Sequence, residues 1–349
     1  MAKEPLLSAK DVEIVFSLRG NYLKAIRRCS LDLYEGETLA IVGESGSGKS
    51  VFTKSFIGML DANGSITGGS IMYQGQDMAK FKTEKEWLAI RGKKISMVMQ
   101  DPMTSLNPLK KIGKQIEESI TYNQGIRGEE ARKMAVEMLA KVGIPDPERR
   151  ANQYPHEFSG GMRQRVVIAI AVACRPQILI CDEPTTALDV TIQAQILELI
   201  RSLQRELKMT VIYITHDLGV VANVADRVAV MYAGQIVEYG LVNEIFYEPW
   251  HPYTWALLSS LPQLGIKGEE LPTIDGTPPN LFNEIHGDAF APRNKQALKI
   301  DFVEEPPYFS VSETHKAKTW YLDPRSPKIE QPMYVRRLRE KMANDEARR

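Results

Sequence analysis

The sequence predicts an α/β fold with a largely parallel β-sheet, an inserted helical subdomain and a C-terminal extension. Helical stretches separate several short apolar segments, which is the order expected when helices cover a parallel sheet. The chain has 349 residues, more than one hydrophobic core usually supports, so appended units are expected. The segments predicted as strands buried on both faces are residues 39–42, 95–99, 178–181, 211–214 and 228–231.

The helical subdomain is expected at about residues 101–165, where the strand pattern disappears. Residues 112–122 and 129–142 have helical periodicity, and Gly143 is a suitable stop. Prolines become frequent after residue 248, which predicts one domain at residues 1–248 and an extension at 249–349. The basic residues 334–349 are expected to form a solvated helix.

Composition limits the classes of function. The 44 basic and 44 acidic residues give a net charge of zero, so any nucleic-acid or lipid contact needs a local surface. The three cysteines lack metal-binding spacing and fit a reducing cytosol. Residues 1–8 do not resemble a signal peptide, and the longest apolar run, 166–174, is too short to span a bilayer. We therefore expect membrane contact only through a partner.

A glycine-rich loop follows the first predicted strand and precedes an expected helix at residues 51–59. Its backbone N–H groups would face phosphate oxygens, with Lys49 reaching the β and γ phosphates and Ser50 binding magnesium. A glycine-rich turn that binds nothing is the alternative, which the flanking strand and helix disfavour. The sequence thus predicts a P-loop NTPase core binding ATP and Mg²⁺. The loop matches the pattern G-x-x-x-x-G-K-[ST] through Gly43, Glu44, Ser45, Gly46, Ser47, Gly48, Lys49 and Ser50.

Two acidic residues, Asp182 and Glu183, follow the strand predicted at residues 178–181. Parallel sheets bind ligands at this carboxyl edge, so Asp182 is expected to help bind magnesium. Glu183 is expected to orient or deprotonate the attacking water. A helix-capping turn is the alternative interpretation of this acidic pair. GTPases and nucleotide kinases also have a phosphate loop and an acidic residue at a strand end, so these two motifs alone do not distinguish the classes.

A second phosphate-binding helix start is predicted where Ser159, Gly160 and Gly161 precede an apolar helix. Here the sequence resembles the ATP-binding subunits of ABC transporters, in which this segment closes on ATP held by the partner subunit. The commoner family pattern has Leu and Gln where this chain has Phe158 and Met162.

The resemblance implies roles for four further residues. Gln100 would sense magnesium and the attacking water, and His216 would contact the γ-phosphate. Asp189 would lie in the loop that crosses the dimer interface, and Phe16 would stack on adenine. A turn histidine and a core aromatic are the alternatives for His216 and Phe16.

The tail narrows the resemblance, which covers roughly residues 8–300. Residues 248–254, 257–262 and 276–279 look like the extension of the longer ATPase subunit in oligopeptide and dipeptide permeases. Many relatives bind an iron–sulfur cluster after this point. Residues 287–294 and the rest of this tail contain no cysteine, so we expect no cluster.

The resemblance implies the ATP-hydrolysing subunit of a peptide importer on the cytoplasmic face of the plasma membrane. Its partners would be a second, non-identical ATPase subunit, two membrane-spanning permease subunits and an extracellular peptide-binding protein, with no nucleic acid. A soluble ABC ATPase acting on ribosomes or DNA is the main alternative, and intact Glu183 argues against a subunit that only binds ATP. The sequence does not distinguish dipeptides, oligopeptides and nickel as substrates. It also does not decide whether the two ATPase subunits are identical.

Overall fold

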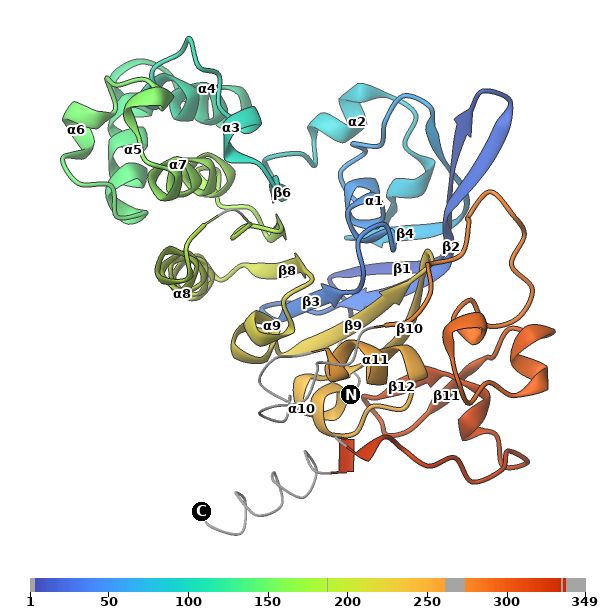
Figure 1. The fold of residues 1–349 in the computed structure, drawn as a ribbon. Coiled ribbons are helices and arrows are strands. Elements are labelled where there is room, and N and C mark those ends of the chain that lie inside the picture. Colours follow the sequence, from blue (N-terminus) through green and yellow to red (C-terminus); the bar gives the residue numbers. More distant parts are fainter. Residues whose placement is uncertain (1–3, 187, 261–273, 334, 337–349) are drawn as a thin grey trace.

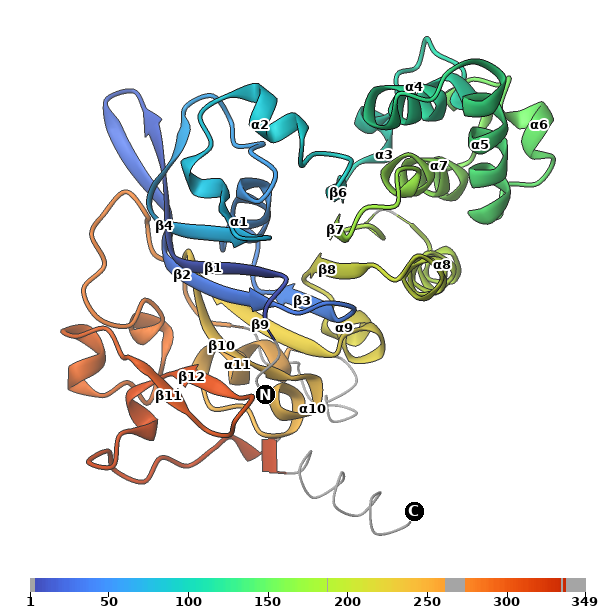
Figure 2. The same ribbon diagram turned by 180° about the vertical axis from the view of Figure 1, so that it is seen from behind.

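The computed structural model describes residues 4–186, 188–260, 274–333 and 335–336. A main sheet carries a smaller antiparallel sheet and α1 on one side, and a helical body extends away from them (Figures 1 and 2). Most of the basic tail predicted as a helix, residues 334 and 337–349, lies outside the described residues. Within the described part, no helix is both long and apolar enough to cross a bilayer.

The main sheet has the strand order β11-β12-β10-β9-β3-β8-β7-β6. Each of the five predicted strands is present, and every pairing among them is parallel. This confirms the predicted α/β fold with a largely parallel sheet. Those strands are β3 (Thr38–Val42), β6 (Ile95–Val98), β7 (Ile178–Asp182), β8 (Thr210–Thr215) and β9 (Arg227–Tyr232).

Three antiparallel strands continue the same sheet: β10 (Gln235–Leu241), β11 (Tyr308–Ser310) and β12 (Lys316–Lys318). Two of them belong to the C-terminal extension. The division proposed at residue 248 therefore separates segments that share one sheet.

The second sheet is antiparallel, in the order β2-β1-β4-β5, and sequence reasoning named none of its strands. Its inner side chains share a core with β3, β8 and helix α1. The four strands are β1 (Leu7–Leu18), β2 (Asn21–Leu33), β4 (Gly64–Tyr73) and β5 (Gln76–Asp77).

The helical body follows β6, and both views show it away from the second sheet (Figures 1 and 2). Its two longest predicted helices agree with the structure to within two residues, and Gly143 follows the second at φ +75°. The last helix runs on to Val172, and it contacts both β6 and α8. The helices are α3 (Pro102–Ser105), α4 (Ile112–Gln124), α5 (Gly128–Lys141), α6 (Pro147–Arg150) and α7 (Gly160–Val172).

The helix after the phosphate loop differs from the one expected at residues 51–59. It begins at Lys49, because the last two loop residues already form its first turn, and it ends at Ser55 before Gly58 at φ +60°. The remaining α-helices are α1 (Lys49–Ser55), α2 (Glu84–Leu88), α8 (Val190–Leu207), α9 (Leu218–Val224), α10 (Val242–Tyr247) and α11 (Pro252–Ser259).

Candidate functional site

The phosphate loop joins β3 to α1, and two of its glycines are required by close packing. Gly43 has φ +151°, and a Cβ there would lie 2.1 Å from the carbonyl oxygen of Met231 on β9. Gly48 has φ +105°, and its Cβ would lie 2.8 Å from Cδ1 of Ile26 on β2. No other residue type fits either position without moving backbone or core side chains. The loop backbone is therefore held directly against the two sheets.

The Lys49 ammonium lies inside the curve of the loop. Its Nζ donates to the carbonyl oxygens of Gly43 at 2.8 Å and Glu44 at 2.9 Å. Burial lowers the pKa of Lys49, while the carboxylates of Glu183 and Asp182 oppose that shift. The loop thus places a cation where its N–H groups and the start of α1 already favour an anion.

Ser50 and Asp182 meet where α1 begins and β7 ends. The Ser50 hydroxyl donates to Oδ1 of Asp182 at 2.9 Å. Burial raises the pKa of Asp182, and the hydrogen bond from Ser50 works against this. A hydroxyl and a carboxylate are the hard oxygen ligands that Mg²⁺ prefers, with nucleotide phosphates and waters completing its coordination. No cluster of three or more His, Cys, Asp or Glu side chains suited to a metal occurs among the described residues.

Glu183 is the centre of a hydrogen-bonded group. Its Oε2 accepts from Gln100 Nε2 at 3.0 Å and from the Thr186 hydroxyl at 2.9 Å, and His216 Nδ1 lies 3.2 Å from its Oε1. Partial burial raises the pKa of Glu183, but the hydrogen bonds from Thr186 and His216 outweigh it and keep the pKa below its usual value. The carboxylate is therefore ionised at neutral pH and held in a fixed orientation.

The backbone at Glu183 is also unusual. Its φ is +45°, in the left-handed region that non-glycine residues seldom adopt, and its N–H donates to the Ile214 carbonyl at 2.9 Å. This turn at the end of β7 directs the side chain toward His216 and Gln100, which follow β8 and β6. The three residues predicted as catalytic are thus brought together. Thr186 was not predicted, and its spacing of three residues from Glu183 was the available signal.

The predicted second phosphate-binding segment lies at the start of α7. Ser159 caps this helix by accepting from the Met162 N–H at 3.4 Å, and Asp189 caps α8 by accepting from the Ile192 N–H at 3.0 Å. A Cβ on Gly161 would lie 2.8 Å from Ile192, so Gly161 allows the two helices to pack closely, while Gly160 faces the Leu188 side chain. Both views show α7 well away from α1 (Figures 1 and 2). Within one chain, this segment therefore lies apart from the phosphate loop.

Phe16, predicted to stack on adenine, lies on β1 and is 8% exposed. A Cβ on Gly64 would lie 2.5 Å from its ring, so the ring covers that glycine on the neighbouring strand β4. The ring belongs to the core of the second sheet. Its contact with adenine stays a prediction.

Glu44 makes contacts that sequence reasoning did not anticipate. Its carboxylate forms two hydrogen bonds with the Arg293 guanidinium, at 2.6 and 3.0 Å, and its N–H donates to the Tyr253 hydroxyl at 2.7 Å. The second residue of the phosphate loop is therefore bound to the C-terminal extension. No local pattern links residues so far apart in the chain.

Comparison with known proteins identifies the family. The oligopeptide transport ATP-binding protein AmiE of Streptococcus pneumoniae is 59% identical over 340 residues, covering 97% of this chain and 96% of that protein. The chain belongs to the ABC transporter family. The family model described as ABC transporter matches residues 26–186, and the model of the oligopeptide/dipeptide transporter C-terminal region matches residues 237–300.

A second relative and a solved structure of an ABC transporter cassette are also similar to this chain. The oligopeptide transport ATP-binding protein OppD of Bacillus subtilis is 58% identical over 341 residues, covering 97% of this chain and 95% of that protein. Among solved structures, the ATP-binding cassette MJ0796, a dimer in a post-hydrolysis state bound to ADP and Pi, has a TM-score of 0.61 at 29% identity. That match covers 68% of this chain and 98% of the cassette, as expected if the C-terminal extension is additional to the ABC core.

Proposed function

We propose that this chain is the ATP-hydrolysing subunit of a membrane importer of oligopeptides or dipeptides. The group formed by Glu183, Gln100 and His216 carries the proposal, because it supplies an ionised, oriented carboxylate in the family's ATPase core. The match of the extension to the oligopeptide/dipeptide C-terminal region supports peptides as the cargo and argues against a soluble ATPase acting on ribosomes or DNA.

In this mechanism Lys49 and the loop N–H groups bind the β and γ phosphates of ATP. Ser50 and Asp182 would hold Mg²⁺, which neutralises phosphate charge during transfer. The Glu183 carboxylate accepts a hydrogen bond from the attacking water and orients it, while His216 is held beside Glu183 by their hydrogen bond.

The separation of α7 and α1 within one chain supports the proposal of a composite site between two chains. In the proposed pair, the Ser159–Gly161 segment of one subunit faces the γ-phosphate held by the other. The partners proposed are a second, non-identical ATPase subunit, two membrane-spanning permease subunits and an extracellular peptide-binding protein. The pair would lie on the cytoplasmic face of the plasma membrane.

The test is affinity purification of the tagged chain from gently solubilised membranes, followed by an ATPase assay. We expect Glu183→Gln to lower turnover by at least about 100-fold, the smallest usual contribution of a general base, because the amide carries no charge and accepts no proton. Glu206→Gln, an exposed carboxylate on α8, is the matched control and should leave turnover unchanged. Recovery with ribosomes or DNA would overturn the transport role, and full turnover in Glu183→Gln would overturn the assigned chemistry.

A further inference from the structure

We propose that the C-terminal extension positions the phosphate loop through Arg293 and Tyr253, and thereby sets the affinity of the chain for ATP. The inference rests on the proposed function of this loop as the ATP site. It assigns a positioning role to two residues that lie far from the loop in sequence.

The first contact is an ion pair with matched geometry. Nη1 of Arg293 lies 2.6 Å from Oε2 of Glu44, and Nη2 lies 3.0 Å from Oε1, which is the two-bond arrangement that fixes both groups in direction. The Arg293 side chain is only 4% exposed, so water competes weakly for it. Its guanidinium also donates to the backbone carbonyls of Asp275 at 2.8 Å and Ile274 at 3.3 Å. The arginine is therefore held by the extension before it reaches the loop.

The second contact holds the loop backbone itself. The Glu44 N–H donates to the hydroxyl of Tyr253, a residue at the start of α11 with no exposed surface. The Tyr253 ring packs against Tyr232 and Phe290, with centroids 4.4 and 5.4 Å away. The Glu44 carbonyl in turn accepts from Lys49 Nζ. One loop residue thus connects the extension to the lysine that would bind phosphate.

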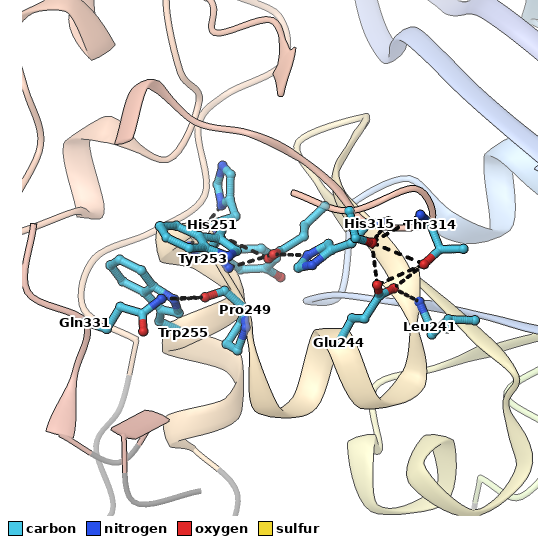
Figure 3. Close-up of polar contacts among 12 residues, drawn as sticks. Leu241, Glu244, Pro249, His251, Tyr253, Trp255, Thr314, His315 and Gln331 are labelled. Carbon is cyan, nitrogen blue, oxygen red and sulfur yellow. Dashed lines mark hydrogen bonds and ion pairs between the residues drawn. The ribbon is translucent and has the colours of Figure 1, made fainter. Parts of the chain in front are cut away.

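A buried polar network fixes the start of α11 and with it Tyr253 (Figure 3). Glu238 on β10 accepts from the N–H groups of Trp250 at 2.6 Å and His251 at 3.1 Å, and His315 Nε2 lies 2.8 Å from it. His251 Nδ1 accepts from the Tyr253 N–H at 3.0 Å. Burial lowers the pKa of His251 to about 3, so the ring is neutral and this nitrogen remains an acceptor. The position of Tyr253 is therefore set by β10 and by the segment before β12.

Just before α11, the carbonyl of Pro249 accepts from Nε1 of Trp255 on that helix at 2.8 Å and from Gln331 Nε2 at 3.2 Å (Figure 3). These bonds attach a late part of the chain to the segment that carries Tyr253. The described part of the extension thus supports Tyr253 through hydrogen bonds from several segments, and such support lowers the entropy that the loop loses when it orders around a ligand.

A purely structural role is the competing explanation, in which the ion pair only attaches the extension to the ATPase core. The Kd of the folded protein for ATP distinguishes the two explanations. If the contacts position the loop, breaking them reduces the fraction of molecules with a binding-competent loop and raises the apparent Kd in proportion. If they only attach the extension, the melting temperature falls while the Kd of the folded protein stays constant.

The experiment measures the Kd of Mg²⁺–ATP and the thermal unfolding of the full-length chain. We expect Arg293→Gln and Glu44→Gln each to raise Kd about tenfold, equal to about 1.4 kcal/mol, and the double variant to be no weaker than either. Tyr253→Phe removes one hydroxyl and should raise Kd about threefold while keeping the fold. Lys295→Gln breaks an exposed ion pair with Asp275, close to Arg293 in the chain, and should leave Kd unchanged.

Two readouts separate failure of this inference from failure of the proposed site. An unchanged Kd in folded Arg293→Gln and Tyr253→Phe, with a lower melting temperature, would overturn the positioning role. In contrast, wild-type affinity in Lys49→Ala would show that ATP binds elsewhere and would overturn the proposed site. In the assembled complex, we expect Tyr253→Phe to raise KM and to leave kcat at saturating ATP within about twofold, which a general loss of structure would not produce.

Discussion

Replacing Gly43 with alanine measures how strictly the phosphate loop is held against β9. The new Cβ would lie 2.1 Å from the Met231 carbonyl oxygen, whereas real Cβ atoms essentially never approach within 3.0 Å, so backbone must move by about 1 Å. The backbone conformation at φ +151° adds strain of roughly 1–3 kcal/mol for a residue with a Cβ. Strain and displacement together are expected to lower the free energy of unfolding by about 4 kcal/mol, which is large for a single substitution.

Denaturant unfolding of Gly43→Ala beside Gly75→Ala separates these two effects. Gly75 has φ +78°, and beyond its chain neighbours nothing lies within 4 Å of the place a Cβ would take. Its alanine variant therefore carries conformational strain without a clash and should lose only about 1–2 kcal/mol. We also expect Gly43→Ala to weaken ATP binding by about 100-fold, since a 1 Å displacement misaligns the loop N–H groups. Equal stability losses in the two variants would refute the reasoning from close packing.

Two further predictions concern the extension. Burial raises the pKa of Asp288 to about 7, so the folded chain keeps a proton that the unfolded chain loses above about pH 4, and this group's stability contribution falls as pH rises from about 4 to 7. Asp288→Asn avoids that loss, so the variant should gain at least about 1 kcal/mol relative to wild type between pH 5 and pH 7.5 in denaturant titrations. A stability difference independent of pH would contradict this prediction. Phe290→Ala removes a buried ring that packs on Tyr253 and Arg293. It should lower the free energy of unfolding by about 3–5 kcal/mol and weaken ATP binding. A loss below about 1 kcal/mol would show that the ring is not a core contact.

The sequence predicted the parallel part of the sheet because buried parallel strands are continuously apolar. The second sheet was missed for a physical reason. Register shifts at Ala9, Val12 and Ile14 interrupt the two-residue alternation of β1, and β4 contains three glycines. The strands β11 and β12 have three residues each, too few to form a pattern.

The candidate site likewise has residues that local sequence predicts and a contact that only the tertiary fold reveals. Lys49, Ser50, Asp182 and Glu183 lie in local motifs whose geometry follows from a strand, a turn and a helix start. The bond between Arg293 and Glu44 depends on how the extension folds back across the sheet, and no property of either residue alone indicates it.

The two strands that the extension adds to the main sheet bear on how the chain is made. The outer edge of β10 is covered by β12 through the pairs Glu238 with Ala317 and Tyr239 with Lys316. Until residues 316–318 leave the ribosome, that edge has unpaired N–H and C=O groups, which favour pairing with other nascent chains. Pairing of the main sheet is therefore completed only after residues 316–318 have been synthesised, and a chain shortened at residue 248 would carry an aggregation-prone edge.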